Sequence, residues 1–566
     1  MGWMAVMMGI SLATGEVAVA ERPAGHPRQT RSVVMAKHGM VATSHPLAAE
    51  AGLSILRQGG NAIDAAIATN AALGVVEPMS CGLGGDLFAI VWDAKSQKLY
   101  GLNASGRSPY AATREFFLRQ GMKNIPGSGP LSWSVPGCVD GWEMLRSRFG
   151  SKSFEDILAP AINYAEEGFP LVELIGAFWQ VSTPSLAKLP DTKRTFLPDG
   201  KMPRVGQTIR NPFQAATLKL VAAEGRDAYY RGSIARRIVD YSQKVGGLFT
   251  LKDFEDHHGE WVEPVSTNYR GYDVWELPPN GQGIAVLQML NILEEYDLAK
   301  MGPHSPEFLH LFVEAKKLAY EDRARWYADP SFAKNVSVER LISKEYAAGR
   351  RKLIDPMKAA LEYEPGDAKL KQSDTVYLTV VDKDRNVVSF IESNFAAWGS
   401  GHVPGDLGFP LQNRGSLFTL EEEHPNVIQP HKRPFHTIIP AMVTKDGKPW
   451  LSFGVMGGDM QPQGHVQILI NIIDHQMNVQ LAGEAVRCRH DGSSSPTGGR
   501  MTDGGEVILE AGLPEATIDS LKAKGHQVRI GRSSEFGGYQ AILIDHENGM
   551  LQGASEHRKD GCAAGY

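Results

Sequence analysis

Four pairs of strand-like segments, spread over the whole chain, place the strongest constraint on the fold. In each pair, two short runs rich in β-branched and aromatic residues flank a polar turn, which is the pattern of an antiparallel hairpin. The pairs occupy residues 87–103, 376–391, 441–455 and 541–553 of the 566-residue chain. They do not repeat with a constant period, so a solenoid is not expected. Strands from both ends of the chain are therefore expected to meet in common sheets.

Helical patterns fill most of the remaining sequence. Two helices in series are expected over residues 46–75, where Gly59-Gly60 ends the first helix and Asn61 caps the second. Residues 110–350 are expected to be mainly helical. Individual helices are expected over residues 154–167, 211–223, 283–298, 306–327, 463–477 and 514–524. With the hairpins, these helices predict a layered architecture with sheets inside and helices outside.

Composition and charge limit the kinds of partner. The chain is 42% hydrophobic and 22% charged, as in ordinary globular proteins. Its formal net charge is -6, and Lys and Arg are dispersed without a basic stripe, so no nucleic-acid partner is expected. No run of about 18 apolar residues occurs, so no membrane span is expected. The four cysteines are far apart and form no CxxC pair, which favours buried small hydrophobic residues over a disulfide framework.

The first 20 residues have some features of a secretory signal. Residues 3–13 form a short apolar run, and Ala18-Val19-Ala20 fits an A-x-A cleavage site. No Lys or Arg precedes the run, and Glu16 lies within the segment, which argues against a signal. The prediction is a periplasmic or secreted protein, or a cytoplasmic one if residues 1–20 are not a signal.

Common cofactor and metal motifs do not occur. The sequence contains no HExxH, no P-loop, no GxSxG nucleophile elbow and no complete GxGxxG. The 17 histidines form no set with metal-ligand spacing. No cofactor and no metal is therefore expected.

Thr375 is the first candidate for a catalytic residue. A polar segment over residues 352–375 reads as an exposed linker, and it ends directly on a predicted strand. By itself, this threonine is an ordinary strand residue. If the Asp374–Thr375 bond breaks, however, Thr375 gains a free α-amine with a pKa of about 7.7–8. That amine can accept the proton of the adjacent Oγ, so one residue supplies both nucleophile and base.

Gly457 and Gly458 are candidates for the oxyanion hole that acyl transfer requires. They follow the strand predicted over residues 450–455 and offer consecutive backbone N–H groups with no side chain in the way. The alternative is a simple turn at the end of the strand.

Several segments resemble γ-glutamyltransferases. The resemblance rests on residues 39–48, 59–66, 278–283, 319–323 and 375–384, together with Pro136-Gly137, Lys432-Arg433-Pro434 and Gly457-Gly458. These segments occur in unbroken order after about residue 33. The chain is thereby identified as a member of this family, in the branch that includes glutaryl-cephalosporin acylases.

The resemblance implies a fold and a processing event. The implied fold is α+β, the four-layer αββα sandwich of N-terminal-nucleophile hydrolases. Cleavage between Asp374 and Thr375 would give a large subunit, residues 21–374, and a small subunit, residues 375–566, which remain together as a heterodimer. Thr375 would serve first in processing and then in catalysis, and Gly457 and Gly458 would form the oxyanion hole.

The substrate-binding residues of the family are only partly matched. Ser393 matches the second active-site threonine and keeps a hydroxyl, whereas Phe395 replaces an asparagine. The arginine that binds the substrate carboxylate falls on Ser105, with Arg107 nearby. The aspartate that binds the substrate amine falls on Leu417.

Five residues are expected to contact the substrate. Arg107 and Arg414 are candidates for the carboxylate, and Asp459 could restore the missing carboxylate partner of an amine. His436 and Thr437 occupy the positions of the family's paired serines. A γ-glutamyl group carries an ammonium that is costly to bury unpaired, whereas a glutaryl group lacks it.

Three functions therefore remain open. The leading one is a self-processing γ-glutamyl hydrolase or transferase that acts on donors such as glutathione and passes the acyl group to water or an amine. The second is an acylase for glutaryl or related amides. The third is a non-catalytic binding protein of the same fold, against which the retained hydroxyl and glycines argue.

Overall fold

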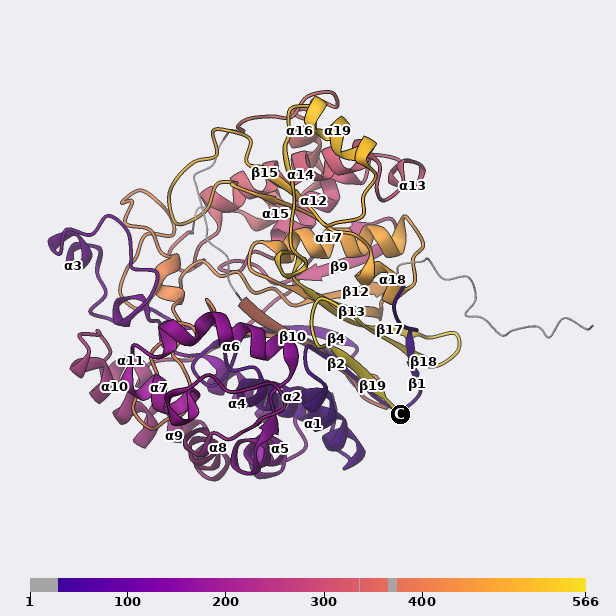
Figure 1. Cartoon of the computed structure of the whole chain (residues 1–566). Coiled ribbons are helices and arrows are strands. Elements are labelled where there is room, and N and C mark those ends of the chain that lie inside the picture. Colours follow the sequence, from indigo (N-terminus) through magenta and orange to yellow (C-terminus); the bar gives the residue numbers. More distant parts are fainter. Residues whose placement is uncertain (1–28, 335, 365–373) are drawn as a thin grey trace, which may run out of the picture.

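The computed structural model describes residues 29–334, 336–364 and 374–566, and two large antiparallel sheets lie face to face at its centre (Figure 1). Within the described residues each sheet has seven strands. The first, sheet A, has the order β1 (Val34–Ala36), β18 (Met550–Ser555), β17 (Gly538–Asp545), β13 (Lys448–Met456), β12 (Ala441–Lys445), β9 (Tyr272–Glu276), β8 (Val265–Tyr269). The second, sheet B, has the order β19 (Cys562–Gly565), β2 (Met40–Thr43), β10 (Asp374–Val381), β11 (Val387–Phe395), β3 (Asp86–Asp93), β4 (Lys98–Ala104), β7 (Glu260–Val262).

Helices cover the outer face of each sheet. On the side of sheet B, α1 (Pro46–Arg57), α2 (Ala62–Val76) and α4 (Cys138–Phe149) pack on the strands, and α5 (Phe154–Glu167), α8 (Pro212–Glu224), α9 (Arg226–Tyr230) and α10 (Ser233–Lys244) pack around these helices. On the side of sheet A, α12 (Ile284–Leu293), α17 (Met460–Ile473) and α18 (Val479–Glu484) pack on the strands, and α14 (Pro306–Trp326) packs on α12. Shorter helices lie around these layers: α3 (Arg114–Arg119), α6 (Glu173–Leu186), α7 (Pro190–Phe196), α11 (Leu251–Glu255), α13 (Leu298–Met301), α15 (Val338–Leu341), α16 (Lys344–Arg351) and α19 (Glu515–Ala523).

Apolar side chains fill all three spaces between the layers. One cluster lies between the sheets and includes Phe88, Tyr377, Ile391, Met442 and Ile542, while two larger clusters join the sheets to their helices. The expected four-layer αββα sandwich is therefore confirmed. Among the described helices, none is both long and apolar enough to cross a bilayer.

The strongest sequence patterns correspond to the observed elements. All four predicted hairpins are present, as β3–β4, β10–β11, β12–β13 and β17–β18. The two helices expected over residues 46–75 are α1 and α2, and the Asn61 side chain accepts hydrogen bonds from the first backbone N–H groups of α2. These elements were found from their apolar runs and end signals, since α2 is buried on all sides and β3 and β11 are buried on both faces.

Weaker patterns were misread. The region expected to be mainly helical is mainly helical, but its described residues also contain five strands, which were not predicted; β7 and β8 are edge strands of the two large sheets, and β9 lies between β8 and β12. Half-buried edge strands carry exposed polar residues, so their alternation is weak. Two small sheets were also missed: β14 (Cys488–Asp491), β15 (Glu506–Leu509) and β16 (Gln527–Ile530) form one, and β5 (Phe169–Pro170) and β6 (Thr208–Ile209) form the other. Helix α12 ends at Leu293 rather than 298, and α17 starts at Met460 rather than 463.

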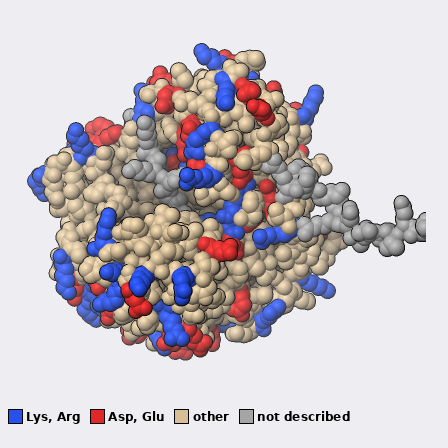
Figure 2. Space-filling view, viewed as in Figure 1, with Lys and Arg blue, Asp and Glu red and all other residues tan. Residues whose placement is uncertain are grey.

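Surface charge is mixed on the face shown in Figure 2, where Lys and Arg are interspersed with Asp and Glu. The predicted signal, residues 1–20, and residues 365–373 of the predicted linker lie outside the described residues.

Segments from before and after residue 375 are interleaved in both sheets. In sheet B, β2 lies between β10 and β19 and pairs with both. In sheet A, β9 pairs with β12, and β1 pairs with β18. A chain cut before Thr375 would keep all these ladders, since none of them depends on the broken bond.

The interleaving predicts that the two fragments stay together after cleavage. A denaturing gel should show fragments of about 41 and 21 kDa, in proportion to the 374 and 192 residues on either side of the cut in the 61.7-kDa chain. Gel filtration of the same sample without denaturant should give one species that contains both fragments. Elution of the fragments in separate peaks would contradict the prediction.

Candidate active site

Thr375 lies near the start of β10, and its side chain is buried. Two contacts between the facing sheets show which part of sheet A it faces. Thr379 Oγ1 lies 2.7 Å from Ser452 Oγ, and a Cβ on Gly454 would lie 2.4 Å from the Tyr377 ring. Alternate residues of a strand point to the same face. The start of β10, which carries Thr375, therefore lies toward the end of β13, where the Gly457-Gly458 turn follows.

Ser393 is the hydrogen-bond partner of the Thr375 hydroxyl. Thr375 Oγ1 donates to Ser393 Oγ at 3.3 Å across the β10–β11 hairpin. Ser393 Oγ also accepts the backbone N–H of Phe395 at 2.8 Å. The Phe395 φ angle is 76°, a value that is unusual for a non-glycine residue. The predicted pair of hydroxyls is thus brought together by neighbouring strands.

The two glycines at the end of β13 adopt a turn that other residues rarely adopt. Their φ angles are 122° at Gly457 and 56° at Gly458, and a Cβ on Gly457 would lie 3.1 Å from the Cα of Gly537. Helix α17 begins immediately after Asp459, so its positive N-terminal end lies beside the turn. Two consecutive glycine N–H groups and a helix N-terminus together suit a developing negative charge.

Arg414 carries a buried guanidinium with few partners. Its side chain is fully buried, and its Nη1 donates to Thr437 Oγ1 at 3.0 Å. Its carbon Cζ lies 5.1 Å from the centre of the Phe395 ring. In the described part of the chain, its Nε and Nη2 have no hydrogen-bond partner and no carboxylate lies within ion-pair distance. Burial lowers the Arg414 pKa to about 9, against the opposing effect of Asp86 and Glu392, so the group stays charged at neutral pH.

His436 is held by Asp86, which sequence reasoning had not singled out. His436 Nε2 lies 3.1 Å from Asp86 Oδ2, and both side chains are fully buried. Burial, reinforced by Arg414, lowers the His436 pKa well below its usual range, so the ring is neutral and donates from Nε2. Asp86 Oδ1 accepts from the N–H groups of Gly106 and Gly137 and from Gln412 Nε2. One carboxylate therefore fixes the segments that carry His436 and Arg414. The only sequence signal for it was an acid at the start of an otherwise apolar strand.

Arg107 is occupied elsewhere. Its Nη2 lies 2.5 Å from Glu260 Oε1, and its Nη1 donates to the carbonyl oxygen of His258 at 2.8 Å. Arg433 binds the same Glu260 oxygen at 2.8 Å. These contacts favour the alternative in which Arg107 braces its loop over the one in which it binds substrate.

Asp459 is likewise paired within the protein. Its carboxylate receives both terminal nitrogens of Arg323, at 2.7 and 3.3 Å. Burial alone would raise the Asp459 pKa, but Arg323 outweighs it and keeps the carboxyl ionised. Leu417, at the family's amine-binding position, is buried in the apolar cluster that also contains Phe395 and Phe435. The structure brings no free carboxylate to this position from either residue.

One group of metal-ligating side chains converges among the described residues, away from these contacts: His310, Glu314 and His526. Glu314 is paired with Lys317 at 2.8 Å and accepts from the Tyr363 hydroxyl. His310 bridges His526 and the carbonyl oxygen of Asp355. These hydrogen bonds account for the group without a metal.

The predicted residues thus form a continuous series of contacts, with one exception. The series runs from Thr375 through Ser393 and Phe395 to Arg414 and Thr437. It continues through Gln282, whose amide donates to both the Thr437 and Gly458 carbonyl oxygens. Arg107 lies outside this series, because its side chain binds Glu260 and the carbonyl oxygen of His258. A hydroxyl nucleophile, a glycine turn and a buried cation in one place can carry out acyl transfer from a substrate with an anionic group.

Known proteins resemble this chain over nearly its whole length. A family model described as Gamma-glutamyltranspeptidase matches residues 48–566. The chain is 40% identical over 537 residues to the glutathione hydrolase-like YwrD proenzyme of Bacillus subtilis (strain 168), covering 94% of this chain and 99% of that protein. It is 36% identical over 538 residues to the Acylase ACY 1 proenzyme of Pseudomonas sp. (strain SE83), covering 92% of each.

The chain is also similar to a solved structure over nearly its whole length. The cephalosporin acylase from Bacillus halodurans matches with a TM-score of 0.88 and 41% identity, covering 97% of this chain and 99% of that chain. Both a hydrolase-like protein and acylases thus occur among the relatives. The two relatives compared by sequence are both named as proenzymes.

The position of Thr375 predicts the outcome of two substitutions. Thr375→Ala should remain one intact chain, because the hydroxyl makes the first attack on the preceding peptide bond, whereas Thr375→Ser should still be cut. The first residues of the smaller wild-type fragment, read by Edman degradation, should be Thr-Val-Tyr-Leu. Cleavage of purified Thr375→Ala at the same bond would rule out Thr375 as the processing nucleophile.

Proposed function

Because the chain belongs to the gamma-glutamyltranspeptidase family of self-processing amidohydrolases and acyltransferases, we propose that it removes carboxylate-bearing acyl groups from amides. Thr375 is the nucleophile. The acyl group is γ-glutamyl, as in glutathione, or its analogue without the amine, glutaryl. The acyl group then passes to water or to an amine.

The observation that carries this proposal is the guanidinium of Arg414. It is fully buried, its Nε and Nη2 have no partner among the described residues, and it contacts Phe395, two residues from Ser393. A buried cation without an anion is costly, and a planar guanidinium fits a carboxylate with two parallel hydrogen bonds. A substrate carboxylate bound there would supply the missing anion.

The remaining residues have defined roles in this proposal. The α-amine that cleavage frees on Thr375 takes the Oγ proton, and Oγ attacks the amide carbonyl. The N–H groups of Gly457 and Gly458 stabilise the oxyanion, and the leaving amine departs with the transferred proton. Ser393 orients the Thr375 hydroxyl. Water or an amine then attacks the ester on Thr375 and releases the acyl group.

Two observations favour glutaryl over γ-glutamyl groups. Leu417 is buried and apolar at the amine-binding position, and the Asp459 carboxylate is already engaged by Arg323. A γ-glutamyl ammonium would therefore need another anion, whereas a glutaryl chain would not. The similarity to a glutathione hydrolase-like protein supports γ-glutamyl as the main alternative acyl group.

The proposal is tested by comparing kcat/KM for three p-nitroanilides: γ-glutamyl, glutaryl and butyryl, the last without a carboxylate. A desolvated charge pair contributes about 2–5 kcal/mol, so at least one carboxylated substrate should exceed butyryl by about 30-fold or more. Equal values for all three would contradict the role of the carboxylate. No turnover of any substrate by fully cleaved protein would favour the non-catalytic binding protein instead.

Arg414 and Arg107 should respond differently to the same substitution. Arg414→Met should raise KM for the preferred carboxylated anilide by about 30-fold or more and leave butyryl turnover nearly unchanged. Arg107→Met should lower thermal stability, because Glu260 loses one partner, and should change KM by less than about threefold. KM and fragment yield are measured on the same preparations. A larger KM effect from Arg107→Met would restore the original assignment of Arg107 to the substrate carboxylate.

A further inference from the structure

Two motifs that support the family resemblance have no role in the reaction described so far. They are residues 278–283, which precede α12, and residues 319–323 within α14. The structure brings both to the same place, the turn formed by Gly457, Gly458 and Asp459, which is called the oxyanion turn below. We propose that Gln282, Tyr320 and Arg323 are positioning residues that hold the oxyanion turn in its reactive geometry. This inference rests on the proposed function.

Gln282 holds the turn through the carbonyl of Gly458. Its Nε2 donates to Gly458 O at 2.9 Å and to Thr437 O at 2.6 Å, so both amide hydrogens are used. Its Oε1 accepts from Arg323 Nη1 at 2.7 Å, and the side chain is fully buried. The amide of Gln282 thus fixes the peptide plane that follows Gly458.

Arg323 and Tyr320 hold the turn through Asp459. Arg323 binds the carboxylate with both terminal nitrogens, a geometry that restricts orientation as well as distance. The Tyr320 hydroxyl donates to the Asp459 carbonyl oxygen at 2.5 Å. These two residues lie one turn apart on α14 and reach the side chain and the backbone of the same residue.

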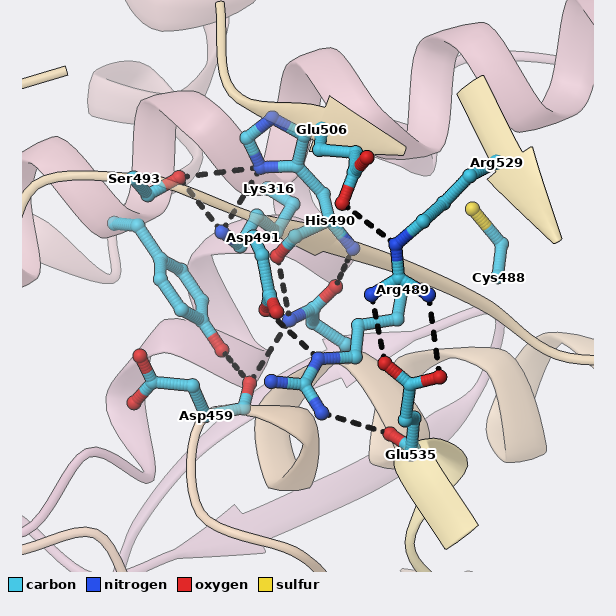
Figure 3. A network of polar contacts seen from close by, with 12 residues as sticks. Lys316, Asp459, Cys488, Arg489, His490, Asp491, Ser493, Glu506, Arg529 and Glu535 are labelled. Carbon is cyan, nitrogen blue, oxygen red and sulfur yellow. Dashed lines mark hydrogen bonds and ion pairs between the residues drawn. The ribbon is translucent and has the colours of Figure 1, made fainter. Parts of the chain in front are cut away.

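A further network of polar contacts adjoins Asp459 and Tyr320 (Figure 3). Gln463 Nε2 donates to the carbonyl oxygens of Asp459 and His490, at 2.9 and 3.2 Å. The Lys316 ammonium lies 3.9 Å from the centre of the Tyr320 ring and donates to Ser493 Oγ at 2.6 Å. The partners of the oxyanion turn are therefore themselves held in place.

Such support is needed because glycine has little conformational preference of its own. Two consecutive glycines can adopt many backbone angles. The N–H groups of Met460 and Gln461, at the start of α17, bind the Gly457 and Gly458 carbonyl oxygens, and the side-chain contacts described above restrict the turn further. An oxyanion hole works because its donors are already oriented, and loss of one donor costs roughly 10²–10³ in kcat. A displacement of about 1 Å can cost about 100-fold. Residues that fix the turn should thus affect kcat without contacting the substrate.

The three positioning residues and the turn come from opposite sides of the cleavage site. Gln282, Tyr320 and Arg323 precede Thr375, whereas the oxyanion turn follows it. The turn therefore has its full set of contacts only while the two fragments are assembled.

The test compares each positioning residue with a matched control on the same helix or beside it. Gln282→Met and Tyr320→Phe remove hydrogen bonds to the turn with little change in volume. The controls are Gln288→Met and Tyr327→Phe, in which buried side chains of the same types lose the 2.5 Å hydrogen bond between them. Gln288→Met also loses a hydrogen bond to Asp322, and neither of these bonds involves the turn. The kinetic constants for the preferred anilide, the fragment yield and the melting temperature are measured for all four variants.

The expected result is a loss of kcat confined to the first pair. Gln282→Met should lower kcat by about 10- to 100-fold and Tyr320→Phe by about 5- to 10-fold, with KM within about threefold of wild type. The controls should lower the melting temperature and leave kcat within about twofold. If Gln282→Met does not fold, Tyr320→Phe, which lacks only a hydroxyl, still decides the question.

Other outcomes overturn the inference. Equal losses of kcat in the turn variants and the controls would show a general structural effect. A rise in KM with unchanged kcat would assign Gln282 to the acyl pocket through Thr437. If the wild-type protein turns over no anilide, the proposed function is wrong and this inference fails with it. If the wild type is active and the variants are unaffected, only the inference is wrong.

Discussion

The close packing of two sheets face to face is the constraint on which the rest of the structure depends. At the point where β10 crosses β13, a tyrosine ring fits against a glycine, Gly454, that has no room for a side chain. Two residues further along, a hydrogen bond joins the Thr379 and Ser452 hydroxyls. These contacts fix the register of one sheet against the other. Since Thr375 belongs to one sheet and the oxyanion turn follows a strand of the other, that register sets the distance between the proposed nucleophile and the proposed oxyanion hole.

The charged residues near the site are distinguished mainly by whether they already have a partner of opposite charge within the protein. Arg107 and Asp459 are both close to family binding positions in sequence, yet each is engaged by an opposite charge within the protein. Arg414 is a buried cation that donates to one hydroxyl among the described residues, while Asp86 and Glu392 act on its charge without a direct contact. A charge that is directly paired contributes to folding, whereas one without a direct partner is available to a ligand. This distinction is the reason for proposing Arg414, rather than Arg107 or Asp459, as the residue that binds the substrate.

Much of the fold and part of the site could be predicted from the sequence. Hairpins and helices such as β3–β4 and α2 were found from their apolar runs, polar turns and helix-end signals. Thr375 was singled out as the nucleophile by the family resemblance, because by itself it is an ordinary strand residue. Strands β7 to β9 were not found, because most of their residues are only half-buried and the strands show no clean alternation. Asp86 and Gln282 were missed as site residues for a different reason. Their importance comes from which distant segments their hydrogen bonds join, and no local pattern contains that information.

The strand order also determines how the enzyme loses activity. Because β2 lies between two strands that follow the cleavage site, neither fragment contains a complete sheet B. During synthesis the two parts are covalently joined, so each finds the other at a high effective concentration. After cleavage that advantage is gone, and fragments that unfold must meet again by diffusion while exposing unpaired strand edges. The lifetime of the mature enzyme is then governed by its rate of unfolding rather than by an equilibrium between folded and unfolded states.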